Sequence, residues 1–326
     1  MSLTKVDFTK VLNDDQIYDQ LMSNYDQLGS DWIAHQWNWM NNIYKAFKDH
    51  YKYLIIISLI EKTLQFYDQM NIKLNFDEFY AKPYFQIEKF NITELCEKLS
   101  LPKETVRRKV LELEKMGVLK RKKKQIFIDR SVFSHVKPSR QIGFTSKYIH
   151  LFCGILNNQK ILSKKLELKS IENLVKKNFS ICWRWFYRLQ IPLVIGYHKM
   201  FEDLSTYHIW GTVAMNQAFN YKQKTKNTNV HALTPDYKSF NENLIKGSGA
   251  SAGVSAMSIS DMTEIPRATV IRKCKYLIKN DFLKLNDKKQ YILSGLNVTK
   301  VLPYQREIFK YKAKFLRKMI NLLIIT

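Results

Sequence analysis

Cysteine is scarce in this chain of 326 residues, and its spacing excludes two kinds of cross-link. No two cysteines form a Cys-x-x-Cys pair, the spacing typical of zinc sites and redox motifs. This usage indicates a reducing compartment, with no disulfide framework and no zinc site. We expect free thiols at Cys96, Cys153, Cys182 and Cys274.

Long apolar runs are also missing. The most apolar stretch, Tyr53–Ile60, covers about eight residues, whereas a membrane-spanning helix needs roughly 20. The first residues, Met1–Asp7, lack the apolar core of a signal peptide. We therefore expect a cytoplasmic, nucleoid-associated protein with no membrane-spanning segment.

Patterns that would indicate catalysis or a bound cofactor are absent as well. The seven histidines are scattered and show no His-x-x-x-His spacing for a metal ion. The small-residue run at 247–253 lacks the Gly-Lys-Ser/Thr ending of a phosphate-binding loop, which favours a hinge. We find no nucleophile elbow, catalytic dyad or pair of carboxylates. The sequence thus predicts neither an enzyme nor a metal or cofactor site.

Positive charge is abundant and unevenly placed. The net charge is +24, which implies a nucleic acid as partner first and an anionic membrane surface second. Residues 1–90 carry a net charge of −3, residues 91–140 carry +8, and residues 141–326 carry +19. The positive charge therefore begins near residue 91, where a repeated motif also begins.

The repeated motif is the most informative feature of the chain. Leu101–Lys109 returns 164 positions later as Ile265–Lys273, and the register holds without a gap to Leu119 and Leu283. Apolar and basic positions are both kept, which indicates one small module used twice. We place the first module at about 84–130 and the second module at about 255–294.

The first module has the pattern of two helices followed by a hairpin. Ile92–Leu99 is expected to be a short helix, and Pro102 can begin a second helix that runs to about Met116. Gly117 is placed to end that helix in the left-handed conformation. Two strands follow, at 118–120 and 125–128, with a basic tip at 121–124 between them.

This order of elements resembles the winged helix-turn-helix domain of bacterial transcription regulators. The resemblance covers about 40 residues in each copy, and it implies that the second helix enters the major groove of DNA. In the first copy it assigns DNA binding to Lys103, Glu104, Thr105, Arg107, Arg108, Arg121, Lys122, Lys123 and Lys124. In the second copy it assigns Arg267, Thr269, Arg272, Lys273, Lys288 and Lys289.

The expected fold class is mainly α with small β-hairpins (α+β), with an internal duplication and a helical segment before each module. We expect an N-terminal arm or short helix (1–29), a segment with the first module (30–140), a basic helical connector (141–182), a segment with the second module (183–300) and a C-terminal amphipathic helix (301–326). Two sets of aromatic matches suggest that the duplication is longer. Trp37 and Trp39 resemble Trp183 and Trp185, and Phe47, Asp49, Tyr53 and Tyr67 match Phe201, Asp203, Tyr207 and Tyr221 at an offset of 154.

The leading hypothesis is sequence-specific binding of double-stranded DNA, in transcription regulation, through two unequal modules. One alternative is a replication initiator of plasmid or phage type that binds repeats at an origin. Another is an architectural protein whose modules contact protein or RNA. Self-association or a protein partner, through the N-terminal 90 residues or the C-terminal helix, stays open.

Overall fold

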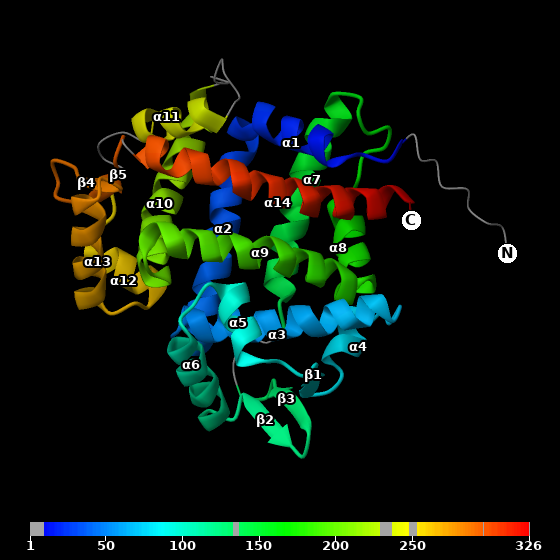
Figure 1. The fold of residues 1–326 in the computed structure, drawn as a ribbon. Helices are drawn as coiled ribbons and strands as arrows, with labels where there is room; N and C mark the ends of the chain where they lie inside the picture. The colour runs from blue at the N-terminus through cyan, green and yellow to red at the C-terminus, as the bar shows by residue number, and fades with distance from the viewer. Residues whose placement is uncertain (1–9, 133–136, 229–236, 248–252, 296, 326) are drawn as a thin grey trace.

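The protein is mainly helical, with two small antiparallel sheets (Figure 1). The computed structural model describes residues 10–132, 137–228, 237–247, 253–295 and 297–325. This is the α+β class expected from the sequence. Most of the small-residue run expected to be a hinge lies outside the described residues. Among those described, no helix is both long and apolar enough to cross a membrane.

The N-terminal quarter of the chain forms four helices. They are α1 (Asp14–Ser23), α2 (Tyr25–Phe47), α3 (His50–Gln69) and α4 (Phe76–Tyr80). Asn13 begins α1 with a capping box, in which side chain and backbone satisfy each other's hydrogen bonds across the first turn. Within the segment for which we expected an arm or short helix, Asp14–Ser23 is thus helical, and α1 packs along the C-terminal helix.

The first module follows as a strand, two helices and a hairpin. Its elements are β1 (Tyr84–Ile87), α5 (Ile92–Leu99), α6 (Lys103–Lys115), β2 (Leu119–Lys122) and β3 (Gln125–Asp129). The strands form one antiparallel sheet in the order β1-β3-β2. The helices lie where the sequence predicted them, and so does the hairpin, except that Arg121 and Lys122, expected in its tip, belong to strand β2. Strand β1 was not predicted.

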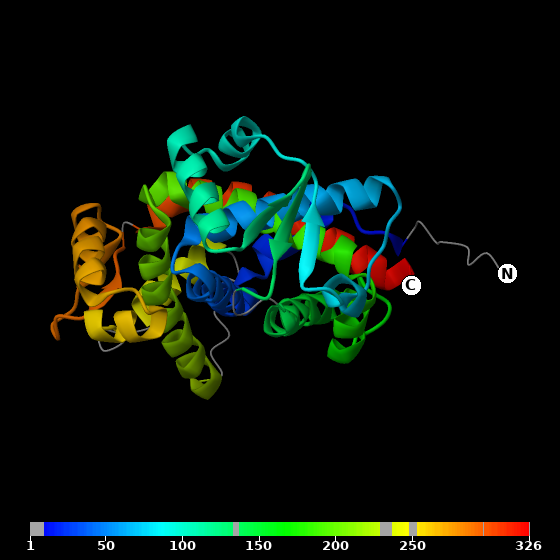
Figure 2. The ribbon, with the colours of Figure 1, turned by 90° about the horizontal axis from the view of Figure 1, so that it is seen from below.

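Five helices connect the two modules. They are α7 (Ser139–Asn158), α8 (Leu168–Lys177), α9 (Phe179–Phe201), α10 (Leu204–Thr228) and α11 (Tyr237–Gly247). Helix α9 lies beside α3, and α10 lies beside α2, so the long helices of the two halves pack against each other. Figures 1 and 2 show this packed body of helices, with the modules at its edge.

The second module repeats the first with a smaller sheet. It comprises α12 (Ala256–Thr263), α13 (Arg267–Lys279), β4 (Leu283–Leu285) and β5 (Tyr291–Leu293). The last helix, α14 (Asn297–Ile325), returns across the body and packs on α9 and α1. Its apolar stripe is buried, so this stripe is used inside the molecule: Phe309, Phe315, Leu316 and Ile320.

The element bounds support the internal duplication. Helices α1 and α2 have the same lengths as α8 and α9, and each begins 154 positions before its counterpart; α3 and α10 also begin 154 positions apart. Helices α5 and α6 have the same lengths as α12 and α13, at an offset of 164. At the offset of 154 Trp37 and Trp39 correspond to Ile191 and Leu193, so matching them with Trp183 and Trp185 was wrong.

The contacts between the halves are reciprocal. Helix α2 packs on α10 while its counterpart α9 packs on α3, and α1 packs on α14 while its counterpart α8 packs on α7. Helices α7 and α14 also correspond, at the offset of 164. Asn157 of α7 donates to the backbone oxygen of Leu162, and Asn321, its equivalent in α14, donates to that of Leu12. Such reciprocity is what a two-fold dimer interface shows. Elements of equal length in the two halves therefore make matching contacts, in line with the internal duplication expected from the sequence.

Candidate nucleic-acid interface

The turn between α5 and α6 sets the direction of α6. Ser100 ends α5 in the left-handed conformation, with φ of 51°, and Leu101 is buried directly after it. Val106, Val110 and Leu113 form the inner stripe of α6 and are almost fully buried. Because these residues recur every three or four positions, the opposite face of α6 is turned to solvent.

Five of the nine first-module residues that the sequence assigned to DNA lie on α6. Lys103, Glu104, Arg107 and Arg108 are exposed, and Thr105 is partly buried. The Arg108 side chain is 64% exposed, and its Nε lies 3.8 Å from Glu112, an ion pair too open to fix the guanidinium. The first turns of α6 therefore present three cations to solvent.

The first hairpin tip is basic and braced at its base. Arg121, Lys122, Lys123 and Lys124 are all exposed, and Arg121 Nε donates to Glu114 Oε1 of α6 at 2.7 Å. Lys120 Nζ donates to Asp129 Oδ2 at 2.7 Å. Burial alone would raise the pKa of the Asp129 carboxyl, but hydrogen bonds from Lys120 and Ser131 hold it below its ordinary value. The hairpin is thus fixed to α6, with its lysines projecting beyond it.

The second module presents fewer cations than the sequence predicted. Arg267 and Arg272 are exposed on α13, Thr269 is partly buried, and Lys288 and Lys289 are exposed at the hairpin tip. Lys273, assigned to DNA from the sequence, instead donates a hydrogen bond from its ammonium group to Asp203, and its side chain is 20% exposed. This residue faces the helical body, which corrects its assignment.

The same ion pair occurs in both halves. Asp49 begins α3 by accepting from the backbone N–H groups of Tyr51 and Lys52, and its second oxygen lies 2.7 Å from Lys109 Nζ of α6. Asp203 begins α10 in the same way and binds Lys273 of α13. Each carboxylate thereby joins a helix of the body to the second helix of a module, α6 or α13. We call α6 and α13 the outer helices. The sequence contained the signal, since both aspartates and both lysines recur at the two offsets.

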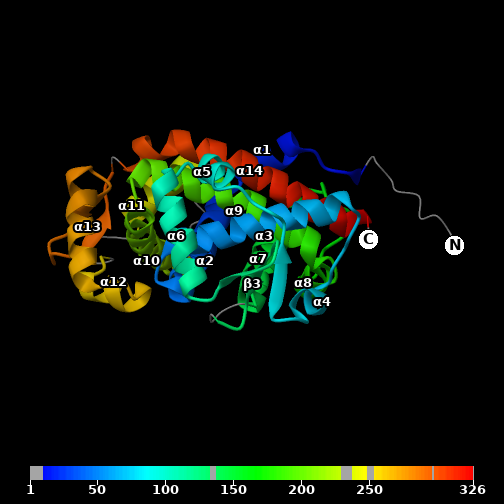
Figure 3. The ribbon, with the colours of Figure 1, turned by 60° about the horizontal axis from the view of Figure 1, so that its bottom comes forward.

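A cross-contact fixes the second module to the first half. Lys45 and Lys48, near the end of α2, both pair with Glu264, the left-handed residue that ends α12. Asn41 Nδ2 donates to the backbone oxygen of Met262 at 3.1 Å. Helices α6 and α13 lie at the end of the molecule away from the C-terminus (Figures 1 and 3). The body of helices therefore contacts both modules through ion pairs and hydrogen bonds.

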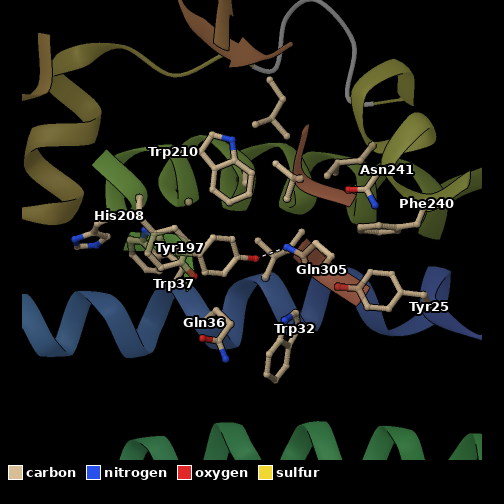
Figure 4. Close-up of a pocket in the computed structure, with 17 residues that line it drawn as sticks. Tyr25, Trp32, Gln36, Trp37, Tyr197, His208, Trp210, Phe240, Asn241 and Gln305 are labelled. Carbon is tan, nitrogen blue, oxygen red and sulfur yellow. Dashed lines mark hydrogen bonds between the residues drawn. The ribbon is translucent and has the colours of Figure 1, made fainter. Parts of the chain in front are cut away.

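An aromatic cleft lies beside the second module (Figure 4). Side chains of α2, α9, α10, α11 and α14 line it together with Leu293 of β5, and Gln305 donates to the Tyr197 hydroxyl across it. The first half has Ile57 and Ile60 where α10 has Gly211 and Ala214, which explains the gap. Its cavity volume is about 60 Å³, enough for about two waters and too small for an organic ligand.

The described residues give no sign of a metal centre. Across ranges 10–132, 137–228, 237–247, 253–295 and 297–325, no three histidine, cysteine or acidic side chains gather in a way that could hold an ion. Burial raises the pKa of the Cys153, Cys182 and Cys274 thiols to about 12, so these sulfurs are poor nucleophiles.

Comparison with known proteins gives no relative. The chain matches no protein-family model, no curated protein and no solved structure.

Proposed function

We propose that the protein binds double-stranded DNA at specific sequences, through α6 and α13 and their hairpin tips, and regulates transcription. One observation carries this proposal: two modules of the same construction each expose the first turns of an outer helix bearing arginine. Such a helix fits the major groove, where arginine can bind guanine through two hydrogen bonds. A cytoplasmic, nucleoid-associated location follows from this proposal.

Electrostatics support a duplex rather than a protein as partner. The first module exposes six cations on α6 and the hairpin: Lys103, Arg107, Arg108, Lys122, Lys123 and Lys124. Cations of this kind neutralise phosphates and release counterions, which makes binding steeply dependent on salt. The body of helices would set the separation of the two bound half-sites, and the unequal outer helices favour a site with two different halves.

Selection of bound duplexes from a random library tests the proposal. We expect one enriched sequence family, and we expect the double variant Arg107→Ala, Arg108→Ala to bind the winning duplex about 100–1,000-fold more weakly, since each arginine that reads a base contributes about 1–3 kcal/mol.

The matched control is the double variant Arg306→Ala, Lys310→Ala, which also removes two cations. Both side chains are exposed on α14, outside both modules. This charge-matched variant should keep nearly full affinity. Equal affinity for all duplexes, or equal loss in both variants, would contradict sequence-specific binding through α6.

A further inference from the structure

A second cationic surface lies between α9 and α14, outside both modules. We call it the cationic groove; Arg188, Lys314, Arg317 and Lys318 surround it, with the rings of Trp185 and Tyr311 as walls. Its cavity volume is about 260 Å³, about four times that of the aromatic cleft. That volume approaches the range of about 300–1,000 Å³ found for small-molecule sites.

The charges of the groove are poorly compensated. Arg317 Nε donates to Asp14 Oδ1 at 2.6 Å, which uses the one carboxylate that lines the groove. Within the part of the chain that the structure describes, Arg188, Lys314 and Lys318 have no ion-pair partner. Burial and the neighbouring Arg188 and Arg317 lower the pKa of Lys318. Asp68 opposes this shift without pairing with Lys318, and three neighbouring cations without an ion-pair partner suit an anion.

The duplicated half gives an internal reference for this groove. The residues equivalent to Arg188, Lys314 and Lys318 are Ala34 of α2 and His150 and Gly154 of α7. The first half thus builds the same helix pair without the cations. The charge cluster is therefore a feature of one groove and is not imposed by the shared packing.

The walls indicate a ligand with a planar ring. The Tyr311 side chain is 42% exposed, and Trp185 is partly exposed with Lys318 Nζ 5.5 Å from its ring centroid. Aromatic side chains of this kind stack on nucleobases, and a cation beside them can hold phosphate. We propose that the cationic groove binds a nucleotide, with its base against these rings and its phosphates on Arg188, Lys314 and Lys318.

The groove is separate from the proposed DNA surface. Helix α14 runs from the second module toward the C-terminus, at the opposite end of the molecule from α13 (Figure 1). The groove residues of α14 lie between its midpoint and its C-terminal end, at 311–318. The nucleotide site therefore goes beyond DNA binding, and either proposal can fail alone.

Calorimetric titration of the full chain with ADP, adenosine and inorganic pyrophosphate tests this site. We expect ADP to bind at least tenfold more tightly than adenosine or pyrophosphate, because only ADP uses both the rings and the cations. The variant Arg188→Gln, Lys318→Gln should weaken ADP binding at least tenfold, and Tyr311→Ala should bring ADP close to pyrophosphate.

The control is again Arg306→Ala with Lys310→Ala, which removes two exposed cations of the same helix outside the groove. It should leave ADP binding unchanged, and circular dichroism checks that each variant is folded. Absence of ADP binding at millimolar concentration, adenosine binding as tightly as ADP, or equal loss in the control would each overturn the proposal. Displacement of ADP by duplex DNA would also overturn it, by assigning the groove to the DNA surface.

Discussion

The two modules share one construction but differ in charge and in the size of their sheets. In the first, β1 joins β2 and β3 in a three-stranded sheet; in the second, the described residues before α12 make an isolated bridge, between Val254 and Tyr291. The first hairpin tip carries four consecutive cations, whereas the second has Asn286 and Asp287 in the first two of these positions and is less basic. The buried stripes and the aspartate–lysine pairs are kept. The packing that positions each outer helix is thus common to both, while the surface offered to a ligand differs.

The interface between the halves should make stability depend on pH. His50 Nε2 lies 3.2 Å from His208 Nδ1, and both rings are buried. Burial lowers the pKa of His50 to about 4, although Asp49 and Asp203 oppose it, and burial and then His50 lower the pKa of His208 well below its ordinary value. Below pH about 6.5 these two histidines bind protons in the unfolded chain but stay neutral in the folded one. Stability should therefore fall from pH about 6.5 toward pH about 4, by up to about 1.4 kcal/mol per pH unit for each histidine.

The duplication supplies the variant that tests this effect. The residues equivalent to His50 and His208 are Leu204 and Leu54, so His50→Leu with His208→Leu places in each position the residue its counterpart already has. Urea unfolding between pH about 4.5 and about 7.5 should give a shallower dependence of the unfolding free energy on pH. His35, whose pKa burial and Lys312 lower to about 3, stays as a residual contributor. An unchanged slope would show that the pair is not the source.

The aspartates that join body and module should have matched effects on stability. Asp49→Ala and Asp203→Ala each remove a helix cap, which costs about 0.5–2 kcal/mol, and each removes an ion pair to a partly buried lysine, although Lys109 keeps Glu112 at 3.1 Å as a second partner. We expect each to lower the unfolding free energy by about 2–3 kcal/mol. Hydrogen bonds from Lys273 and Thr206 outweigh burial and lower the pKa of the Asp203 carboxyl. Its contribution is present at neutral pH and is lost as pH falls below about 4.

Thermal unfolding of both variants checks the equivalence, and Asp203→Asn separates the two causes because asparagine still caps a helix. A large loss for one aspartate alone would break the comparison between the halves.

The difference in surface charge between the modules predicts unequal contributions to DNA affinity. Ile271 and Ala268 stand in α13 where α6 has Arg107 and Glu104, so α13 offers fewer groups to base edges. The variant Arg267→Ala, Arg272→Ala should weaken binding to the selected duplex only about tenfold, or about 1.4 kcal/mol. Titration of labelled duplex, alongside the Arg107→Ala, Arg108→Ala variant, measures the ratio. Equal losses from the two modules would refute the asymmetry.

The local features of the modules could be predicted from the sequence. The stripe of Val106, Val110 and Leu113 and the ending glycine at Gly117 depend on residues within a few turns of each other. Strand β1 could not be predicted from the sequence, because Tyr84–Ile87 forms its strand hydrogen bonds with β3, about 40 positions later along the chain. The cationic groove was missed for the same reason, since α9 and α14 meet only in the folded body.

Lys273 shows where a local pattern misleads. It occupies a basic position of an exposed-looking helix, and its partner Asp203 lies 70 positions earlier. The Trp-x-Trp comparison failed for a different reason: it rested on two aromatic pairs alone, and the helix bounds do not keep their offset of 146. The offset of 154, from Phe47, Asp49, Tyr53 and Tyr67, is the one that the helix bounds keep.

The smallest predicted effect concerns the residue that ends each outer helix. Gly117 and Asp281 occupy equivalent positions and both have positive φ, of 74° and 60°. Glycine adopts this conformation without a steric cost, whereas a residue with a Cβ is strained there, aspartate less than most. Asp281→Gly should therefore stabilise the protein by about 0.5–1 kcal/mol.

The ion pair lost in that variant has little bearing on the result. Lys300 Nζ lies 3.7 Å from Asp281 Oδ2, and both side chains are largely exposed, so the pair contributes well under about 1 kcal/mol. The reverse change, Gly117→Asp, should destabilise by a similar or larger amount, and differential scanning calorimetry of the two variants measures both signs. If Asp281→Gly lowers the melting temperature, then Asp281 contributes something other than a strained helix end, and the equivalence of the two positions does not extend to their energetics.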